Sequence, residues 1–385
     1  MMSIASQAGL TALYGLFLIS PSVSGLEVSS GEFIQTVNPT ALENSSTFIV
    51  NDFFDEQSMI GLVKNDLTES RVLTAEQLAS NTFIYALHGS DFNADHPNRT
   101  AGINSFASQF TFDSTDILQS AATGRIGLGG VMRFDLPARD DGTPRFFIMG
   151  DWTLEYDNTR TEDYNFNNNP NSPVKPVAEH NVSGWFLRNH IDFPVIGYDV
   201  LNQTIFSNSD SFYLSGDLAW SPELVQAFFP ESELYRPTSS FVMCAQDDAA
   251  LAEQTAMQIP CVFPNITLNG QSDTAHLNAS ESINLTVDLG VATSTAYPNA
   301  DYFVAFVYQD TFYWLNSNFE WSTSPAAAYQ GSLVDFRNIA IPSPASIIGS
   351  LDSGMSVPIY FGVDTTQNGT FDEPYRFTSV TLQVN

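Results

Sequence analysis

The chain has 385 residues, with 43 acidic and 13 basic side chains and a formal charge of −30. A field of that sign repels phosphate backbones and anionic lipid, which excludes nucleic acid as a partner. It attracts divalent cations, although solubility in a salty medium is a sufficient reason for the same charge. The length predicts two domains, and the 30 Phe and 14 Tyr residues favour β-rich cores.

The N-terminus carries the pattern of an export signal. Residues 10–19 are an apolar run too short to span a bilayer, and the small residues Ser22 and Ser24 fit a signal-peptidase site. The first basic residue is Lys64, so the run lacks the usual basic segment before it. We therefore predict a signal peptide over residues 1–25, a mature chain without a membrane span, and a secreted protein that is extracellular, on the cell surface or periplasmic.

The strongest structural pattern lies in residues 124–157. Apolar side chains alternate with polar or small ones on both sides of the turn Asp141-Gly142, where glycine accepts a positive φ. The pattern predicts an antiparallel hairpin whose buried face consists of Ile126, Leu128, Gly130, Met132, Phe134, Leu136, Phe146, Ile148, Gly150, Trp152, Leu154 and Tyr156. Further on, a Ser-Pro-Glu sequence beginning at Ser221 predicts a short helix that ends at Phe229.

The chain contains two cysteines, Cys244 and Cys261. In an exported protein such a pair is expected to form one disulfide. The stretch between them is rich in Ala, Gln and acids, which predicts a helix and a domain boundary. The predicted fold class is therefore all-β with a few short helices: a larger β-sandwich over residues 26–243, a disulfide-closed helical linker over residues 244–261, and a second β-sandwich over residues 262–385.

The last third of the chain changes to short alternating runs separated by turns. Such runs are Phe263-Pro-Asn-Ile-Thr-Leu-Asn, Ser282-Ile-Asn-Leu-Thr-Val-Asp, Ala300-Asp-Tyr-Phe-Val-Ala-Phe and Tyr360-Phe-Gly-Val-Asp. About seven strands in roughly 120 residues is the spacing of an immunoglobulin-like sandwich. On these runs, residues 262–385 resemble the immunoglobulin-like modules appended to many bacterial secreted proteins. The resemblance implies a spacer or a binding platform without catalytic residues of its own.

One acidic loop near the C-terminus is a candidate calcium site. Oxygen ligands at Asp364, Asn368 and Asp372 have part of the spacing of a calcium loop. Tyr375 stands where the bidentate Glu of such a loop is expected. A hairpin loop with an Asn-Gly turn explains the same residues without a metal.

A second acidic loop contains Asp91, Asn93 and Asp95, which are also spaced as in a calcium loop. His96 replaces the glycine that such a loop needs at its sharp turn. His88 and His96, together with the aspartates, would instead suit zinc, and an exposed polar loop is the third reading. Calcium is the one cofactor that the sequence suggests.

The tryptophans fall into two groups. Trp152 and Trp185 lie on apolar strand faces and are assigned to the core, with His190 on the solvent side opposite Trp185. Trp314 and Trp321 flank a polar stretch and are candidates for an exposed platform that stacks on sugars.

Each nucleophile, metal or phosphate motif in the sequence is incomplete, so we predict no catalytic residues. We expect an exported, non-catalytic protein of the cell surface or extracellular matrix that acts in binding or adhesion, or as a structural component. Its expected partners are polysaccharide or other surface proteins. The alternative is a secreted carbohydrate-binding protein or glycan-active enzyme with catalytic acids among Asp151, Glu155 and Asp157.

Overall fold

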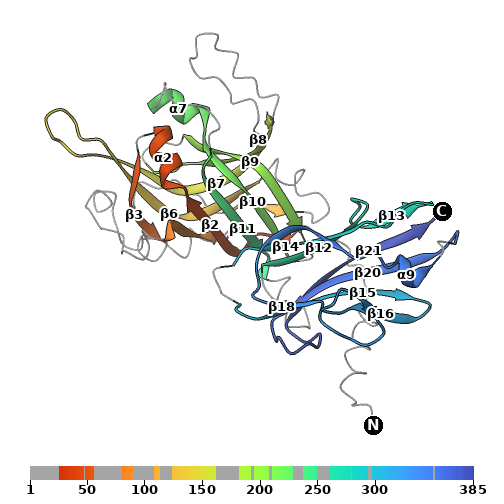
Figure 1. The fold of residues 1–385 in the computed structure, drawn as a ribbon. Helices are drawn as coiled ribbons and strands as arrows, with labels where there is room; N and C mark the ends of the chain where they lie inside the picture. Colours follow the sequence, from red (N-terminus) through yellow and green to blue (C-terminus); the bar gives the residue numbers. More distant parts are fainter. Residues whose placement is uncertain are drawn as a thin grey trace. The chain divides into compact units, whose positions relative to one another are not determined.

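A computed structural model defines the fold of two compact units, Val23–Leu251 and Ala252–Asn385, which we call the N-terminal and C-terminal units (Figure 1). The structure describes residues 26–46, 48–55, 80–89, 108–112, 124–161, 182–191, 195–207, 210–228, 237–248, 261–278, 280–293, 297–349 and 352–385.

Three predictions fall outside these residues. They are the signal peptide of residues 1–25, the calcium loop of Asp91, Asn93 and Asp95, and most of the linker helix, residues 249–260.

The predicted all-β class is confirmed, because strands dominate both units. The helices among the described residues are short: α2 (Pro39–Ser46), α7 (Pro222–Phe228) and α9 (Ala345–Ile348).

The N-terminal unit is built on one nine-stranded sheet. Its strands are β2 (Ser30–Val37), β3 (Ile49–Asp55), β4 (Thr82–His88), β6 (Arg125–Leu136), β7 (Arg145–Thr161), β8 (Val182–Arg188), β9 (Ile196–Ser207), β10 (Ser211–Trp220) and β11 (Pro237–Gln246). A small separate ladder joins β1 (Leu26–Glu27) to β5 (Thr111–Phe112).

This sheet closes on itself, which differs from the sandwich that we predicted for the unit. The strand order is β6-β4-β2-β11-β10-β9-β8-β7, and β6 also pairs with β7, so eight strands form a ring. The ninth strand, β3, pairs with the second half of β6. A strand with one buried face shows the same alternation in a ring and in a sandwich, so periodicity does not distinguish the two.

Large aromatic side chains fill the inside of the ring. Trp152, Trp185 and Trp220 are each at most 1% exposed, which confirms the core assignment of the first two. Trp220 stacks on Tyr198 with ring centroids 4.4 Å apart. A small polar network is buried with them, since the Tyr85 hydroxyl lies 3.1 Å from the side-chain oxygen of Gln35.

The central hairpin forms as β6 and β7, but its second strand does not keep one face inward. The register shifts between Leu128 and Val131 of β6, which creates a bulge. As a result Met149 and Trp152, three positions apart on β7, both belong to the core. The predicted inward face is therefore wrong at the start of β7, where Phe146 is 39% exposed.

Helix α7 begins as its sequence predicts. The Ser221 hydroxyl oxygen accepts a hydrogen bond from the backbone N–H of Leu224 at 3.1 Å, which is an N-cap contact, and Pro222 occupies the first helical position. Leu224 and Val225 then pack on the core of the ring.

The C-terminal unit packs two sheets around a second core. The smaller sheet has the order β12 (Val262–Leu268), β14 (Leu285–Val291), β19 (Phe336–Ile341). The larger has the order β13 (Thr274–Leu277), β21 (Tyr375–Val384), β20 (Ser356–Asp364), β15 (Ala300–Tyr308), β16 (Thr311–Leu315), β17 (Trp321–Ser322), with β18 (Tyr329–Gly331) also on β15. Inward side chains from both sheets, such as Ile266 and Val304, form the core between them.

The predicted disulfide is confirmed, because Cys244 and Cys261 are both disulfide-bonded and are the only cysteines of the chain. Cys244 lies within β11, so this strand extends into the segment that was predicted as linker.

The bulge in the hairpin predicts a strong glycine requirement at Gly150. A Cβ atom there would lie 2.3 Å from the backbone oxygen of Gly130. We expect Gly150→Ala to lower the free energy of unfolding by about 3 kcal/mol through overpacking, as measured by urea denaturation. Gly142→Ala is the matched control, because nothing lies within 4 Å of its added Cβ and only its positive φ of 80° costs energy, about 1 kcal/mol. Equal losses in the two variants would contradict the clash.

The disulfide predicts a second stability difference. Closing a loop of this length contributes about 3 kcal/mol through the entropy of the unfolded chain. We therefore expect the double variant Cys244→Ala, Cys261→Ala to unfold at a lower urea concentration than the native chain. Thiol labelling of the unfolded, unreduced native protein should detect no free thiol, and two labelled cysteines would contradict the bond.

Candidate functional site

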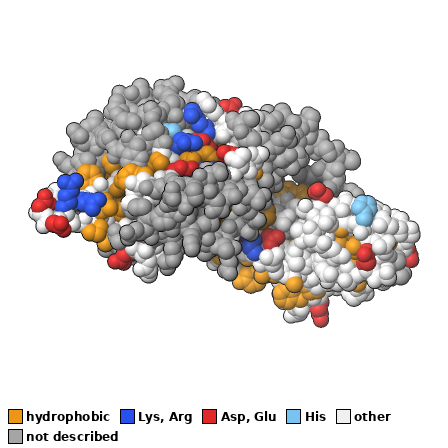
Figure 2. All heavy atoms as spheres, turned by 90° about the horizontal axis from the view of Figure 1, so that it is seen from above, with side chains coloured by type: hydrophobic (Ala, Val, Ile, Leu, Met, Phe, Trp, Pro, Cys, Tyr) orange, Lys and Arg blue, Asp and Glu red, His pale blue; other side chains and the backbone are white. Residues whose placement is uncertain are grey.

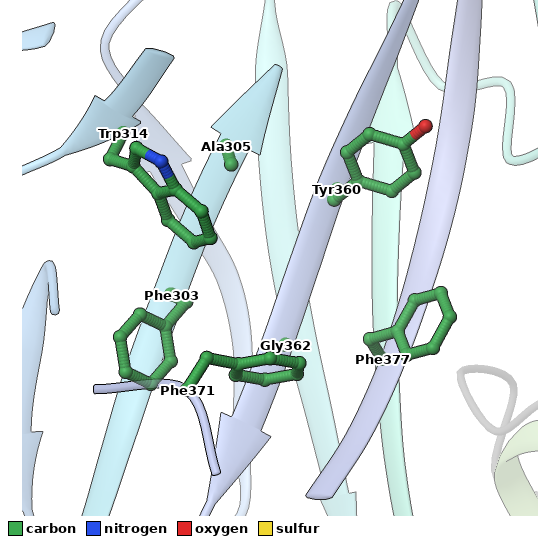
Figure 3. A pocket seen from close by; sticks show the side chains of 7 residues that line it. All are labelled: Phe303, Ala305, Trp314, Tyr360, Gly362, Phe371 and Phe377. Carbon is green, nitrogen blue, oxygen red and sulfur yellow. The ribbon is translucent and has the colours of Figure 1, made fainter. Parts of the chain in front are cut away.

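The outer face of the larger sheet in the C-terminal unit carries an apolar hollow, which we call the aromatic hollow (Figure 3). The space free of atoms over it is about 310 Å³, a value that includes open solvent above the hollow. Its lining residues are Phe303, Ala305, Trp314, Tyr360, Gly362, Phe371 and Phe377.

Strand register explains the shape of the hollow. Two cross-strand rows each place one small residue between two aromatic ones: Trp314, Ala305 and Tyr360 in the first row, and Phe303, Gly362 and Phe377 in the second. Side chains directly opposite one another in a sheet lie about 5 Å apart. The small residues therefore form the floor, and the rings on both sides form the walls, as Figure 3 shows.

Neighbouring rings of the hollow meet nearly at right angles. The Phe303 ring lies 6.2 Å from that of Trp314 with an interplanar angle of 83°. On its other side it lies 5.2 Å from the ring of Phe371 at 77°. These are edge-to-face contacts, which stabilise aromatic pairs and orient adjacent walls in different directions.

The seventh lining residue, Phe371, comes from the loop between β20 and β21. Buried Asp364 accepts a hydrogen bond from the backbone N–H of Asp372 at 3.0 Å, and Asp301 accepts one from Gly369. Both carboxylates thus hold the loop against the sheet with Phe371 over the floor of the hollow.

The structure places the predicted calcium ligands Asp364, Asn368 and Asp372 in one loop, where their side chains make hydrogen bonds with other groups of that loop. The Asn368 amide donates to the Asp372 carboxylate at 2.7 Å. Burial raises the pKa of Asp364. The described residues contain no group of three or more His, Cys, Asp or Glu side chains placed to hold a metal ion. Calcium binding at this loop stays a prediction. A bound ion would have to replace these hydrogen bonds.

The predicted exposed tryptophan platform is wrong, because Trp314 is only 7% exposed and Trp321 is half-buried. Trp314 lines the hollow, whereas Trp321 packs edge-to-face on Phe306 of the inner core, with ring centroids 4.9 Å apart. Sequence reasoning missed the other rings of the hollow. One available signal was the run after Ala300, which is apolar on both faces and so indicates a strand covered on its outer side too.

The acids of the alternative enzyme hypothesis lie on β7 in the N-terminal unit. Asp151 is fully buried and accepts a hydrogen bond from the backbone N–H of Gly130 at 3.2 Å. Glu155 is ion-paired with Arg188 at 3.0 Å. Asp157 accepts a hydrogen bond from Thr159, the main reason that its pKa is lowered. Each carboxylate is thus engaged by its own strand or by a neighbouring one.

His190 is 9% exposed, so its predicted place on the solvent side is wrong. Its Nε2 lies 2.9 Å from the Thr153 hydroxyl, which also contacts the Glu155 carboxylate at 2.6 Å. A carboxylate only accepts, so Thr153 donates to Glu155 and accepts from the His190 ring. The hydroxyl proton therefore points to the acid, and the imidazole does not activate Thr153 as a nucleophile.

A second polar cluster, which sequence reasoning missed, joins β7, β9 and α7. Arg160 is 3% exposed and contacts Asp199 at 2.7 Å and Glu223 at 2.6 Å. Its guanidinium also lies 5.2 Å from the centre of the Phe186 ring. A buried charge needs such partners, so the cluster is explained by packing of the fold.

On the face seen in Figure 2, some acidic side chains of the described residues lie beside Lys or Arg side chains, and others lie singly among uncharged surface. The helices that the structure describes include none with the length and hydrophobicity needed to cross a bilayer.

Comparison with known proteins yields neither a matching family model nor a matching curated protein. Assignment of a function therefore rests on the geometry of the aromatic hollow and of the polar clusters.

The buried histidine predicts a pH dependence of stability. Desolvation is the main cause that lowers the pKa of His190 to about 4, with Arg125 and Arg188 acting in the same direction and Glu155 against them. In the unfolded chain the imidazole of His190 binds a proton near pH 6.5. The contribution of the buried neutral imidazole to stability is therefore fully present above that pH and is lost as the pH falls toward 4.

We expect His190→Gln to flatten the fall in the free energy of unfolding between pH 6.5 and 4, measured by denaturant titration at each pH. His276→Gln is the matched control, since His276 is exposed on β13. An unchanged pH profile in His190→Gln would contradict the burial of a neutral imidazole.

Proposed function

We propose that this chain is an exported, non-catalytic binding protein that acts at the cell surface or in the extracellular matrix. The observation that carries the proposal is the aromatic hollow, an apolar site that is partly open to solvent on the outer face of a sheet. Its lining consists of rings, the methyl group of Ala305 and the backbone of Gly362. Except for the Tyr360 hydroxyl, these groups bind a ligand by contact and have no proton or electron pair suited to catalysis.

Export is supported by the disulfide between Cys244 and Cys261, because such bonds persist in oxidising compartments. The proposed signal peptide of residues 1–25 would direct the chain there.

The C-terminal unit is proposed as an immunoglobulin-like module that presents the hollow. The strand order supports this, with β12, β14 and β19 in one sheet and β21, β20, β15 and β16 in the other. An outer sheet face of such a module is available to a partner, since the inner face forms the core.

A carbohydrate ligand is the second candidate, and the specific observation in its favour is Trp314 in the wall of the hollow. Sugar rings stack on aromatic faces, but specific sugar sites add polar side chains around the stack. The lining offers the Tyr360 hydroxyl as its one polar side-chain group besides the indole of Trp314.

A binding panel tests the proposal. We expect the purified protein to be retained on an immobilised surface protein or polysaccharide without releasing soluble sugar. Trp314→Leu should reduce that retention about tenfold, the usual effect of losing a central aromatic contact. Phe319→Leu is the matched control, because Phe319 is 54% exposed in the same unit and lies outside the hollow.

The rival function gives a different result. If the native protein released soluble sugar and Glu155→Gln did not, the chain would be a glycan-active enzyme. That result would overturn the non-catalytic proposal. Binding that survives Trp314→Leu would place recognition elsewhere on the chain.

A further inference from the structure

We propose that the aromatic hollow binds an organic cation of the quaternary ammonium type, such as the trimethylammonium group of choline. This inference rests on the proposed binding function and names the class of ligand.

The ring arrangement suits a cation. The face of an aromatic ring is electron-rich and attracts a positive charge within about 6 Å of its centroid. Phe303 has Trp314 and Phe371 as neighbours at 6.2 and 5.2 Å, nearly perpendicular in both cases. A charge placed over the floor of the hollow is therefore within reach of several rings that face different directions.

The lining of the hollow is apolar and holds no competing positive charge. Ala305 leaves room between Trp314 and Tyr360, whereas the Phe371 ring packs over Gly362, where an added Cβ would lie 2.9 Å from it. The lining contains neither lysine nor arginine. Cation–π attraction is stronger where the ring faces are desolvated, as they are in such a hollow.

The lining has a single side-chain hydrogen-bond acceptor, the Tyr360 hydroxyl, and this scarcity distinguishes between kinds of cation. A primary ammonium has three N–H donors and loses their hydrogen bonds to water when it enters an apolar site. A quaternary ammonium has no N–H donor and loses none. The hollow therefore favours a fully substituted nitrogen over a lysine side chain.

The charge of the surrounding unit is complementary to such a ligand. Residues 261–385 contain eleven aspartates and glutamates against two arginines. Two of these acids, Asp301 and Asp364, are buried beside the hollow and accept hydrogen bonds from the loop that carries Phe371. A field of this sign raises the local concentration of cations before they bind.

Calorimetric titration of the full chain with choline tests the inference. The matched probe is the uncharged carbon analogue of choline, in which a tert-butyl group replaces trimethylammonium. The two have the same shape, so their difference reports the charge. We expect choline to bind roughly tenfold more tightly than the analogue, in the range of cation–π energies at desolvated sites.

Variants locate the site. Trp314→Leu and Phe303→Leu keep an apolar side chain but remove a ring, and each should weaken choline binding roughly tenfold. Phe371→Leu repeats the test on the loop, outside the strands, in case a strand variant fails to fold. Phe319→Leu should bind choline as the native chain does.

Three results would overturn the inference: no heat of binding at millimolar choline, equal affinity for the uncharged analogue, or choline binding that survives all three ring variants. Each of them leaves the non-catalytic binding function standing, because that proposal fails on a different measurement, the release of sugar from a polysaccharide.

Discussion

Backbone pairing between neighbouring strands is the constraint on which the rest of this structure depends. In the C-terminal unit, the register that sets Ala305 between Trp314 and Tyr360 also sets Gly362 one row away. A slip of one residue would turn these side chains to the opposite face of the sheet. The floor and the six lining residues on strands follow from this register, whereas Phe371 is placed by its loop.

The same constraint has a different result in the N-terminal unit. There β6 pairs with β7 on one side and with β4 and β3 on the other, so the sheet closes and its edges are largely removed. The inside is filled mainly by rings such as Trp152 and Trp220, with the Tyr85–Gln35 hydrogen bond buried among them, and other polar groups form clusters of their own. Arg160 pairs with Glu223, and Glu155 pairs with Arg188. Ion pairs of this kind join neighbouring elements and stabilise the fold.

The two units differ in the groups that they offer to a ligand. The polar clusters of the N-terminal unit are buried or half-buried and are hydrogen-bonded within themselves, so a ligand would have to break existing contacts to use them. The aromatic hollow offers surface that is apolar and open on one side. A binding function needs only such a surface, whereas catalysis would need reactive groups free to meet a substrate.

The sequence by itself determined the all-β class, the alternation of β6, the helix after Ser221 and the pairing of Cys244 with Cys261. These depend on local periodicity, on capping chemistry, or on the presence of just two cysteines. Tertiary structure alone decided the closure of the first sheet, the reversal of alternation before Trp152, and the meeting of rings in the hollow. Each of these depends on pairing between distant strands, and periodicity within one strand carries no information about its partner or its register.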